Sequence, residues 1–402
     1  MMKVALIDNM NNMFFSFCRY LRDRGINAHL FVIPGMPEHF TPENDTFENV
    51  SELDYIHEFP IRTTSRTWLL SLGGTFINLD CIKSYDVIIA CGGSLAFLNR
   101  KGINVDIFIP YGFDLKLPFL VDLKHRPVSF AHYWFSVYQR KGIFSSRYVI
   151  GLKKHAFFNS ALNKLDMDYL EMGIPMVYNK KRFEKYGDHW NFFKNHDFIV
   201  FSQARQLWYT NAYNMNDFDV HGGVKRNDKL IKAFARFIEQ SSFKSPILVL
   251  FEYGTDVQAS KALIDEIGIT NYVRWMHQMP RKYIVQGLRL ASLACDSFRY
   301  GLVNINGTSA ESMSEGVPLI RYMGDTLQDK NSKFYKAPII NALEEDEIFN
   351  VFVDYEKNQD KYKAIGKAGL KWFNEQLGEG LVDEYIKLIE QIYHQKRQEA
   401  NN

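Results

Sequence analysis

Features that would quickly assign a function are scarce in this sequence of 402 residues. No run approaches the roughly 18 apolar residues of a membrane-spanning helix, and the start, MMKVALIDNM, lacks the long apolar segment of a secretory signal. The 48 basic and 46 acidic residues leave a net charge of only +2, which excludes a strong general affinity for polyanions. The four cysteines lack paired metal-type spacing and lie in apolar settings, so we expect reduced core thiols in a cytoplasmic protein.

Hydrophobic residues are plentiful, at 46% of the chain with 15% aromatic, and this suits well-filled cores in two or three domains. The beginning of the chain reads as a strand over 3–8, a helix over 13–24 that stops at Gly25, and a second strand over 26–33. This strand–helix–strand order predicts a doubly wound parallel sheet. The same alternation resumes at Phe198, with no repeat at a short fixed period.

The segment from Asp296 to Ile320, DSFRYGLVNINGTSAESMSEGVPLI, carries the strongest functional pattern. An apolar run ends at its first residue, and a loop containing glycine and asparagine follows. The loop leads into a short predicted helix that ends at Gly316, before a buried strand begins. A loop of small residues at a helix start offers free backbone N–H groups and the positive end of the helix dipole. This arrangement favours an anion, above all a phosphate.

Two interpretations of Thr308 and Glu311 remain open from the residues alone. Their spacing is that of a capping box, in which Thr308 caps the helix and contributes about 0.5–2 kcal/mol to its stability. Alternatively, Glu311 accepts hydrogen bonds from the two hydroxyls of a ribose whose phosphates lie at the helix start.

The line GTSAESMSEGVPLI resembles the C-terminal-domain signature of GT-B glycosyltransferases, in particular the retaining family 4 enzymes, with Glu311, Gly316 and Pro318 in register. The preceding DSFRYG is similar to the equivalent loop of the O-linked N-acetylglucosamine transferase family. The resemblance implies an α/β GT-B fold, with two Rossmann-like doubly wound domains that face each other across a cleft. It also implies that Glu311 holds the donor ribose and that the donor diphosphate meets Asn306, Gly307, Thr308 and Ser309.

The sequence departs from the family at one position. Family 4 enzymes usually carry a second glutamate eight residues before the ribose acid, and here Val303 stands there. The resemblance implies retention of anomeric configuration, but the incomplete glutamate pair weakens that implication.

The segment Ile174-Pro175-Met176-Val177-Tyr178 looks like the hinge of GT-B enzymes. It sets the expected organisation: an N-terminal acceptor-side domain over 1–178 and a C-terminal donor-binding domain over 179–375. By analogy with the family, the last helix, 376–402, packs back on the N-terminal domain.

Positive side chains should face the leaving diphosphate, because negative charge accumulates there as the glycosidic bond breaks. Family 4 enzymes use an arginine after the first strand of the second domain and a lysine before the next helix, which the resemblance transfers to Arg205 and Lys225. Twenty residues separate the two, so an insertion over 209–222 must loop out. Arg226 or Lys229 could replace Lys225.

Three further places have a functional and a structural interpretation. The resemblance implies that Met276 and His277 lie in the loop that holds the nucleotide base, although His277 fits a structural role equally well. Asn11 and Asn12 follow the first strand, at the sheet edge where doubly wound folds bind ligands, and should face the sugar or acceptor. His132 is either a sugar or acceptor contact or part of an aromatic-rich packing helix.

No metal or cofactor is expected. The pairs Asp166/Asp168 and Asp217/Asp219 do not follow buried strands, so we interpret them as surface acids. The lysine pairs 153–154 and 180–181 could rest on an anionic membrane surface or simply be solvated.

The sequence therefore predicts a metal-independent glycosyltransferase that moves a sugar from a UDP- or GDP-type donor to a glycan, glycolipid or related acceptor, as in polysaccharide biosynthesis. No nucleic acid is expected as partner. Peripheral contact with the inner face of the membrane is an option that the lysine pairs leave open. Two alternatives remain: a nucleotide-sugar epimerase on the same fold, and a non-catalytic subunit that binds a nucleotide or a sugar.

Overall fold

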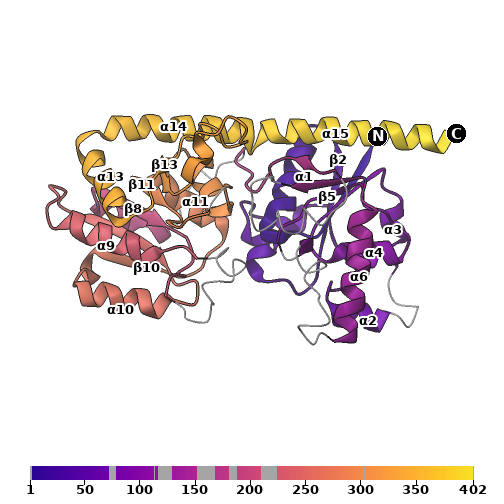
Figure 1. Cartoon of the computed structure of the whole chain (residues 1–402), viewed down its shortest axis with the longest axis horizontal. Helices are drawn as coiled ribbons and strands as arrows, with labels where there is room; N and C mark the ends of the chain where they lie inside the picture. Colours follow the sequence, from indigo (N-terminus) through magenta and orange to yellow (C-terminus); the bar gives the residue numbers. More distant parts are fainter. Residues whose placement is uncertain are drawn as a thin grey trace. The chain divides into compact units, whose positions relative to one another are not determined.

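The computed structural model describes residues 2–71, 78–112, 114–115, 129–151, 168–180, 188–209, 224–301 and 304–401. Two compact units make up the chain (Figure 1). Unit 1 comprises Met1–Tyr178 together with Gln376–Asn402, and unit 2 comprises Asn179–Glu375. Each unit is built around one parallel sheet.

The sheet of unit 1 has the strand order β3-β2-β1-β4-β5-β6-β7, and all neighbouring strands run parallel. Because β1 lies inside the sheet and the chain moves outward to both sides of it, the sheet is doubly wound, as predicted. The strands are β1 (Lys3–Ile7), β2 (Asn27–Val32), β3 (Ile56–Glu58), β4 (Val87–Ala90), β5 (Ile107–Phe108), β6 (Tyr148–Gly151) and β7 (Leu170–Glu171).

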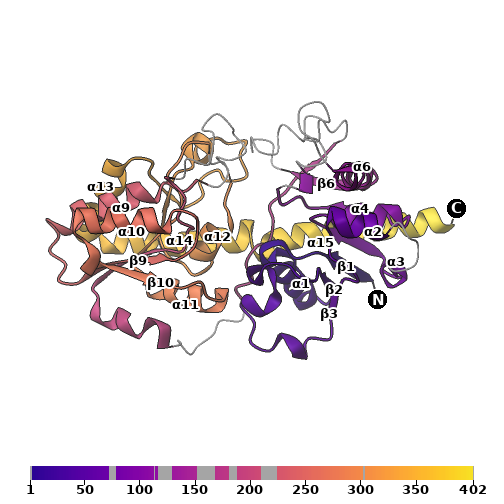
Figure 2. The same ribbon diagram turned by 90° about the horizontal axis from the view of Figure 1, so that it is seen from below.

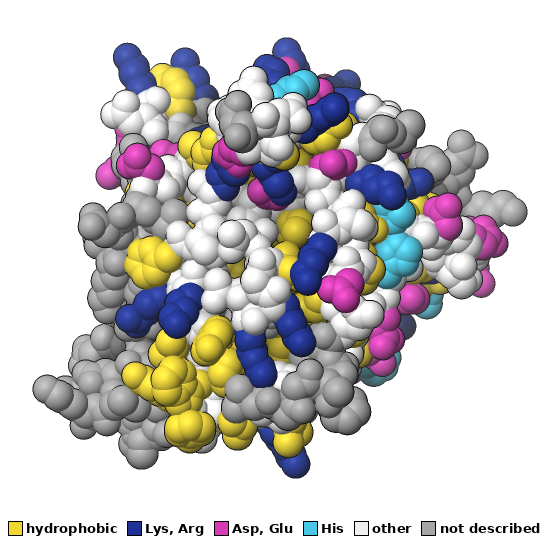
Figure 3. Space-filling view, turned by 90° about the vertical axis from the view of Figure 1, so that its right-hand side faces the viewer, with side chains coloured by type: hydrophobic (Ala, Val, Ile, Leu, Met, Phe, Trp, Pro, Cys, Tyr) yellow, Lys and Arg dark blue, Asp and Glu magenta, His cyan; other side chains and the backbone are white. Residues whose placement is uncertain are grey.

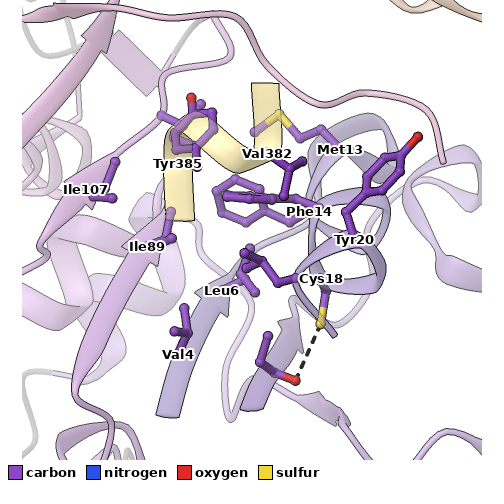
Figure 4. Packing of buried hydrophobic residues seen from close by; sticks show 14 of the residues in the cluster. Val4, Leu6, Met13, Phe14, Cys18, Tyr20, Ile89, Ile107, Val382 and Tyr385 are labelled. Carbon is purple, nitrogen blue, oxygen red and sulfur yellow. Dashed lines mark hydrogen bonds between the residues drawn. The ribbon is translucent and has the colours of Figure 1, made fainter. Parts of the chain in front are cut away.

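Helices cover both faces of this sheet (Figure 2). On one face, α1 (Met13–Asp23) and α15 (Glu379–Asn401) share a core, in which Phe14, Val382 and Tyr385 pack over the β1 and β4 side chains (Figure 4). On the other face lie α2 (Ser65–Leu70), α3 (Asp80–Lys83), α4 (Ser94–Arg100) and α6 (Phe130–Phe144). The last helix, α15, therefore belongs to unit 1, although the whole of unit 2 separates it from the rest of unit 1 in the sequence.

The sheet of unit 2 has the order β10-β9-β8-β11-β12-β13, again with parallel neighbours. Its strands are β8 (Phe198–Ser202), β9 (Pro246–Phe251), β10 (Val273–Met276), β11 (Leu293–Cys295), β12 (Leu319–Arg321) and β13 (Ile340–Asn341). The two central strands, β8 and β11, are apolar and buried along their whole length, as expected for a sheet covered on both faces.

Six helices of the described residues belong to unit 2: α9 (Asn227–Ile238), α10 (Val257–Ile267), α11 (Arg281–Leu290), α12 (Gly307–Ser314), α13 (Glu345–Lys357) and α14 (Gln359–Gln376). The apolar faces of α9 and α13 pack against the sheet in one core. The alternation of strands and helices predicted to resume at Phe198 is confirmed. Short 3-10 helices occupy Met10–Asn12, Glu38–Phe40, Pro42–Asn44, Val50–Glu52, Asp188–Asn195, Thr270–Tyr272 and Gly324–Leu327.

Candidate functional site

Helix α12 begins at the carboxyl edge of the unit 2 sheet, after β11. Its N-cap is Asn306, whose side-chain oxygen accepts a hydrogen bond from the Ser309 amide at 3.0 Å. The prediction that Thr308 caps the helix is wrong, because Thr308 already lies inside the helix and donates its hydroxyl to Asn306 Oδ1 at 2.9 Å. Gly316 has φ +74° just beyond the helix, the left-handed conformation that ends it as predicted.

Glu311 does not complete a capping box. Its side chain is buried, and its Oε1 accepts a hydrogen bond from Arg281 Nε at 2.8 Å. Its Oε2 accepts one from Gln203 Nε2 at 3.2 Å, and the same Gln203 amide donates to the Thr308 carbonyl at 3.0 Å. A carboxylate has about four acceptor positions, so the oriented oxygens can each accept one more hydrogen bond.

Asp296 is the centre of a buried polar cluster beside the start of α12. Its Oδ1 accepts from Lys225 Nζ at 3.0 Å, and its Oδ2 accepts from Ser309 Oγ at 2.6 Å. Arg321 Nη1 lies 3.4 Å from the same Oδ2 and donates to Ser309 Oγ at 2.6 Å. Ser309 thus links the first turn of α12 to both charged groups.

The chain holds Lys225 in place through its backbone as well as its ammonium group. Its amide donates to the Leu207 carbonyl at 2.8 Å, and its carbonyl accepts from the Phe298 amide at 2.9 Å. The ends of the predicted insertion are therefore brought together, while residues 210–223 lie outside the described part. Neither Arg226, which pairs with Asp228, nor Lys229, which donates to the Leu343 carbonyl, has a contact with the Asp296 cluster among the described interactions.

Arg321 is fully buried at the end of β12, and within the described residues its Nε and Nη2 have no hydrogen-bond partner. The same holds for Nε of Arg299, a neighbour on which the positive charge of Arg321 acts. Buried donors are nearly always satisfied by protein, water or an ion. Two guanidinium groups with unused donors therefore mark a place that can receive a ligand rich in acceptors.

The electrostatics of the cluster show an excess of positive charge. Burial alone would raise the pKa of Asp296, but the Lys225 ammonium and the Arg321 guanidinium hold it well below its ordinary value. Burial lowers the pKa of Lys225, although Asp296 opposes this change. Burial, reinforced by Arg321, lowers the pKa of Arg299 to about 10. One carboxylate is thus shared among several cations.

Arg205 lies in the loop after β8, half-buried, and its positive charge also lowers the pKa of Lys225. The structure therefore brings together Arg205, Lys225 and the start of α12, all predicted site residues from segments far apart in sequence. Phosphate oxygens are the ligands that such cations and a helix N-terminus bind best.

Met276 and His277 lie farther along the same edge, at the end of the edge strand β10. His277 Nδ1 lies 2.7 Å from Glu252 Oε2, while 91% of the His277 side chain is exposed to solvent. Glu252 also accepts a hydrogen bond from Lys261 at 2.6 Å. The described contacts give His277 an ion-pair partner, and its role towards a nucleotide base remains a prediction.

In unit 1, the side-chain amides of Asn9 and Asn12 in the turn after β1 form hydrogen bonds within the protein. Asn12 is 1% exposed, and its Nδ2 donates to the carbonyls of His39 and Thr41 at 3.2 and 3.0 Å. Its Oδ1 accepts from Asn9 Nδ2 at 2.7 Å. These bonds give Asn12 a structural function, which the sequence did not indicate. Asn11 has φ +55° and is half-buried. Its role as a sugar or acceptor contact remains a prediction.

Two carboxylates lie at the carboxyl edge of the unit 1 sheet: Asp8, which is buried, and Asp114, which is half-buried. Asp114 accepts backbone hydrogen bonds from Gly92, Tyr111, Gly112 and Leu115. Burial, with the Asp114 charge in addition, raises the pKa of Asp8 to about 7. Gly92 has φ +64°, and a Cβ there would lie 2.0 Å from Asp8 Oδ2, so only glycine fits.

The remaining predicted positions are His132 on α6 and a set that lies outside the described residues. His132 is half-buried in the first turn of α6, where its amide donates to Ser129 Oγ at 3.2 Å. Val303, Asp166, Asp217, Asp219, Lys153, Lys154 and Lys181 lie outside the described residues. The described residues contain no group of three or more His, Cys, Asp or Glu side chains that could hold a metal ion. None of the helices searched there is long and apolar enough to cross a membrane.

Sequence reasoning missed Gln203, Arg281, Arg299 and Arg321 as site residues, and named Asp296 only as the acid that ends an apolar run. Asp296 was detectable, because an acid directly after a buried strand lies at the ligand-binding edge of a parallel sheet. Arg321 gave a weaker signal, an arginine at the end of the apolar run VPLI.

No family model matches this sequence, and no curated protein matches it significantly. Solved structures do match. Sucrose-phosphate synthase from Thermosynechococcus elongatus aligns with 98% of this chain and 100% of its own, at 12% identity and a TM-score of 0.55. Anabaena HepE in complex with UDP and glucose aligns over 96% and 98%, at 12% identity and a TM-score of 0.57. The chain has the GT-B fold.

A third GT-B structure supports the same conclusion about fold. S. aureus TarM, solved in a complex that includes UDP, aligns with 97% of this chain and 100% of its own at 10% identity and a TM-score of 0.57. These low identities establish the architecture, and with it the predicted α/β fold of two Rossmann-like units. They do not confirm the narrower prediction of a retaining family 4 member.

Proposed function

We propose that this GT-B protein is a glycosyltransferase that takes a sugar from a nucleotide-diphosphate donor, with unit 2 holding the donor. The observation that carries the proposal is the excess of buried positive charge at the start of α12. There Lys225 and Arg321 share the Asp296 carboxylate, and buried guanidinium donors of Arg299 and Arg321 have no partner among the described residues. A diphosphate supplies both the negative charge and the acceptor oxygens.

In the proposed reaction, the cations stabilise the leaving nucleotide diphosphate as the bond to the sugar breaks. Lys225 and Arg205 neutralise the developing charge, and the amides of Gly307 and Thr308 at the start of α12 add the positive end of the helix dipole. Glu311, oriented by Arg281 and Gln203, accepts hydrogen bonds from the ribose hydroxyls.

The finer points are part of the same proposal. A UDP donor is supported by the UDP in the complexes of HepE and TarM. Retention, a glycan or lipid-linked acceptor and a role in polysaccharide biosynthesis are proposed from the sequence resemblance. Metal independence is proposed because the Asp pairs do not follow buried strands, and a peripheral place at the cytoplasmic membrane face is proposed from the lysine pairs.

The test is calorimetric titration with UDP, GDP and UMP, followed by a screen for donor hydrolysis with and without EDTA. UDP should bind more tightly than UMP, because the second phosphate meets the cationic cluster. Lys225→Met should weaken UDP binding about 10- to 150-fold, the effect of losing a hydrogen bond to a charged group.

Lys229→Met is the matched control. Lys229 is a similarly buried lysine four residues away, but it bonds to the Leu343 carbonyl and to Glu344 instead. Its variant should keep full UDP affinity. Equal UDP affinity in wild type and Lys225→Met would contradict the proposal. Binding without turnover of any donor would favour the non-catalytic subunit, and interconversion of free donors would favour the epimerase.

A further inference from the structure

Helix α6 of unit 1 is apolar on both sides, although only one side is covered. Its buried residues, Phe135, Ser136, Gln139, Gly142 and Ile143, face the protein core. Gly142 approaches α4 so closely that a Cβ there would lie 2.9 Å from the Leu95 carbonyl oxygen. The covered side of α6 is therefore tightly packed against α4. The helix cannot rotate to bury its other side without breaking this packing.

The other side of α6 carries large exposed aromatic residues. Phe130, Trp134 and Phe144 are 66%, 37% and 45% exposed. Residues 130, 134, 137, 141 and 144 follow one another at steps of four and three, so they form a single stripe along the helix. Phe130 and Trp134 pack edge to face with ring centroids 6.2 Å apart, which fixes the aromatic end of this stripe.

Helix α2 extends the apolar surface. It packs beside α6, with the rings of Trp68 and Tyr138 5.0 Å apart, and its Leu70 is 69% exposed. We call Leu70, Phe130, Trp134 and Phe144 the α2/α6 apolar patch. In Figure 3, hydrophobic side chains gather in the lower part of the face, where Figure 1 places α2 and α6, with Lys and Arg side chains near them.

The described segments that form α2, α4 and α6 carry charge of only one sign. The segments 59–71, 91–105 and 129–146, which include α2, α4 and α6, contain no aspartate or glutamate. Their basic residues are Arg62, Arg66, Arg100, Lys101, Arg140 and Lys141. Arg140 and Lys141 are exposed on α6, and Lys141 Nζ lies 5.0 Å from the Tyr138 ring centroid. The chain as a whole is nearly neutral, so this is a local concentration of positive charge.

Tryptophan, phenylalanine and leucine on a surface helix, with lysine and arginine beside them, match the interface of an anionic lipid bilayer. We infer that the α2/α6 apolar patch rests on an anionic membrane surface, with the aromatic side chains in the headgroup region and the basic side chains on the lipid charges. The inference gives a location to the peripheral contact named above. It depends on this surface alone and not on the proposed transfer reaction.

The test is co-sedimentation of the full chain with vesicles of phosphatidylglycerol and phosphatidylcholine, compared with vesicles of phosphatidylcholine alone. Binding to the anionic vesicles should be strong and should weaken as salt is raised. Arg140→Glu with Lys141→Glu should lower the partition coefficient by about 30-fold or more, since each basic residue near the surface contributes roughly a factor of five. Phe130→Ser with Trp134→Ser should lower it at any salt concentration.

Matched controls come from unit 2. Tyr272 is 40% exposed and Lys232 is an exposed lysine of α9, so Tyr272→Ser and Lys232→Glu remove a similar aromatic and a similar charge elsewhere. Both controls should bind vesicles like wild type. Thermal melting and UDP titration of every variant show that unit folding and the nucleotide site are intact, which separates failure of this inference from failure of the proposed function.

Three outcomes would overturn the inference: wild type that does not bind anionic vesicles, unit 2 controls that lose binding as much as the α6 variants, or α6 variants that bind unchanged. Light scattering can give a fourth outcome that would overturn the inference. If wild type self-associates and Phe130→Ser with Trp134→Ser is monomeric, the patch is an interface between protein copies.

Discussion

At the carboxyl edge of its sheet, unit 2 gathers Lys225, Arg299 and Arg321 around the Asp296 carboxylate, whereas unit 1 places the buried Asp8 and the half-buried Asp114 at the same edge of its own sheet. The two sheets share one architecture, so the fold does not decide the charge. In unit 2 the pKa of the carboxylate is lowered by neighbouring cations, and in unit 1 the pKa of both carboxylates is raised, chiefly by burial.

The difference indicates what each edge can receive. The unit 2 edge keeps positive charge that a bound anion would balance. The unit 1 edge satisfies Asp114 with four backbone amides, and Asp8 takes up a proton near neutral pH, so this edge offers no charge to an anion.

The largest expected effect comes from Asp296→Ala. Removing this carboxylate leaves Lys225 and Arg321 buried without a counter-charge, which should lower the free energy of unfolding by about 3–5 kcal/mol. Denaturant titration measures the loss. Added UDP should restore more stability to the variant than to wild type, because its phosphates replace the missing negative charge; a variant as stable as wild type without ligand would contradict the charge excess described for unit 2.

In unit 1, Asp8→Asn should raise the free energy of unfolding, in contrast to Asp296→Ala in unit 2. The native pKa of Asp8, about 7, is above its unfolded value of 3.8, so the native state holds this proton more tightly. The tighter binding of this proton stabilises the native state fully at pH values below the unfolded pKa of 3.8. This stabilisation is lost as the pH rises through about 7. Asparagine keeps an acceptor for the Asn9 amide and has no charge to bury. The substitution should therefore be about 2–3 kcal/mol more stabilising at pH 8 than at pH 5.

Thermal melting of Asp8→Asn at the two pH values checks this expectation. Asp80→Asn, whose side chain is 76% exposed in the same unit, serves as the control and should show no such pH dependence. If Asp8→Asn changes stability equally at both pH values, Asp8 does not titrate as described and the contrast between the two edges disappears.

Glu311→Gln tests whether the unit 2 edge binds a nucleotide and not only inorganic phosphate. If Glu311 holds the ribose, UDP affinity should fall by about 1.5–3 kcal/mol, while affinity for pyrophosphate stays the same. Glu315→Gln is the control and should bind UDP normally, because Glu315 is a buried glutamate at the opposite, C-terminal end of α12, where it pairs with Arg289. A fall in stability with unchanged UDP affinity would assign Glu311 a purely structural role.

The smallest expected effect concerns the start of α12. Asn306→Ala removes the N-cap hydrogen bond to Ser309 and should cost about 1 kcal/mol in unfolding free energy. Thr308→Val should cost less, since Thr308 is not the cap. The equivalent change in unit 1, Asn12→Ala, should cost more than Asn306→Ala, because Asn12 makes no cap bond to α1 and instead makes three side-chain hydrogen bonds, one of them buried and two part-buried. A reversed order, measured by denaturant titration, would contradict these assignments.

Most strands and helices were predictable, because buried parallel strands are short apolar runs and the helices between them have clear periodicity. The location of α12, and Lys225 before α9, also followed from the sequence. The wrong cap shows the limit of such patterns. Asn306 and Thr308 are both good capping residues, two positions apart, and only the backbone conformation decides which one flanks the helix.

By itself, the sequence determined the alternation of strands and helices, the place where a loop of small residues enters α12, and the near-neutral charge of the whole chain. Only the tertiary structure decided that Lys225, Asp296 and Arg321 meet in one buried cluster, that Arg281 orients Glu311, and that Asp8 is buried beside Asp114 in unit 1. The reason is physical: local patterns follow from the neighbours of a residue in the chain, whereas burial and charge balance depend on side chains that folding brings together from distant segments.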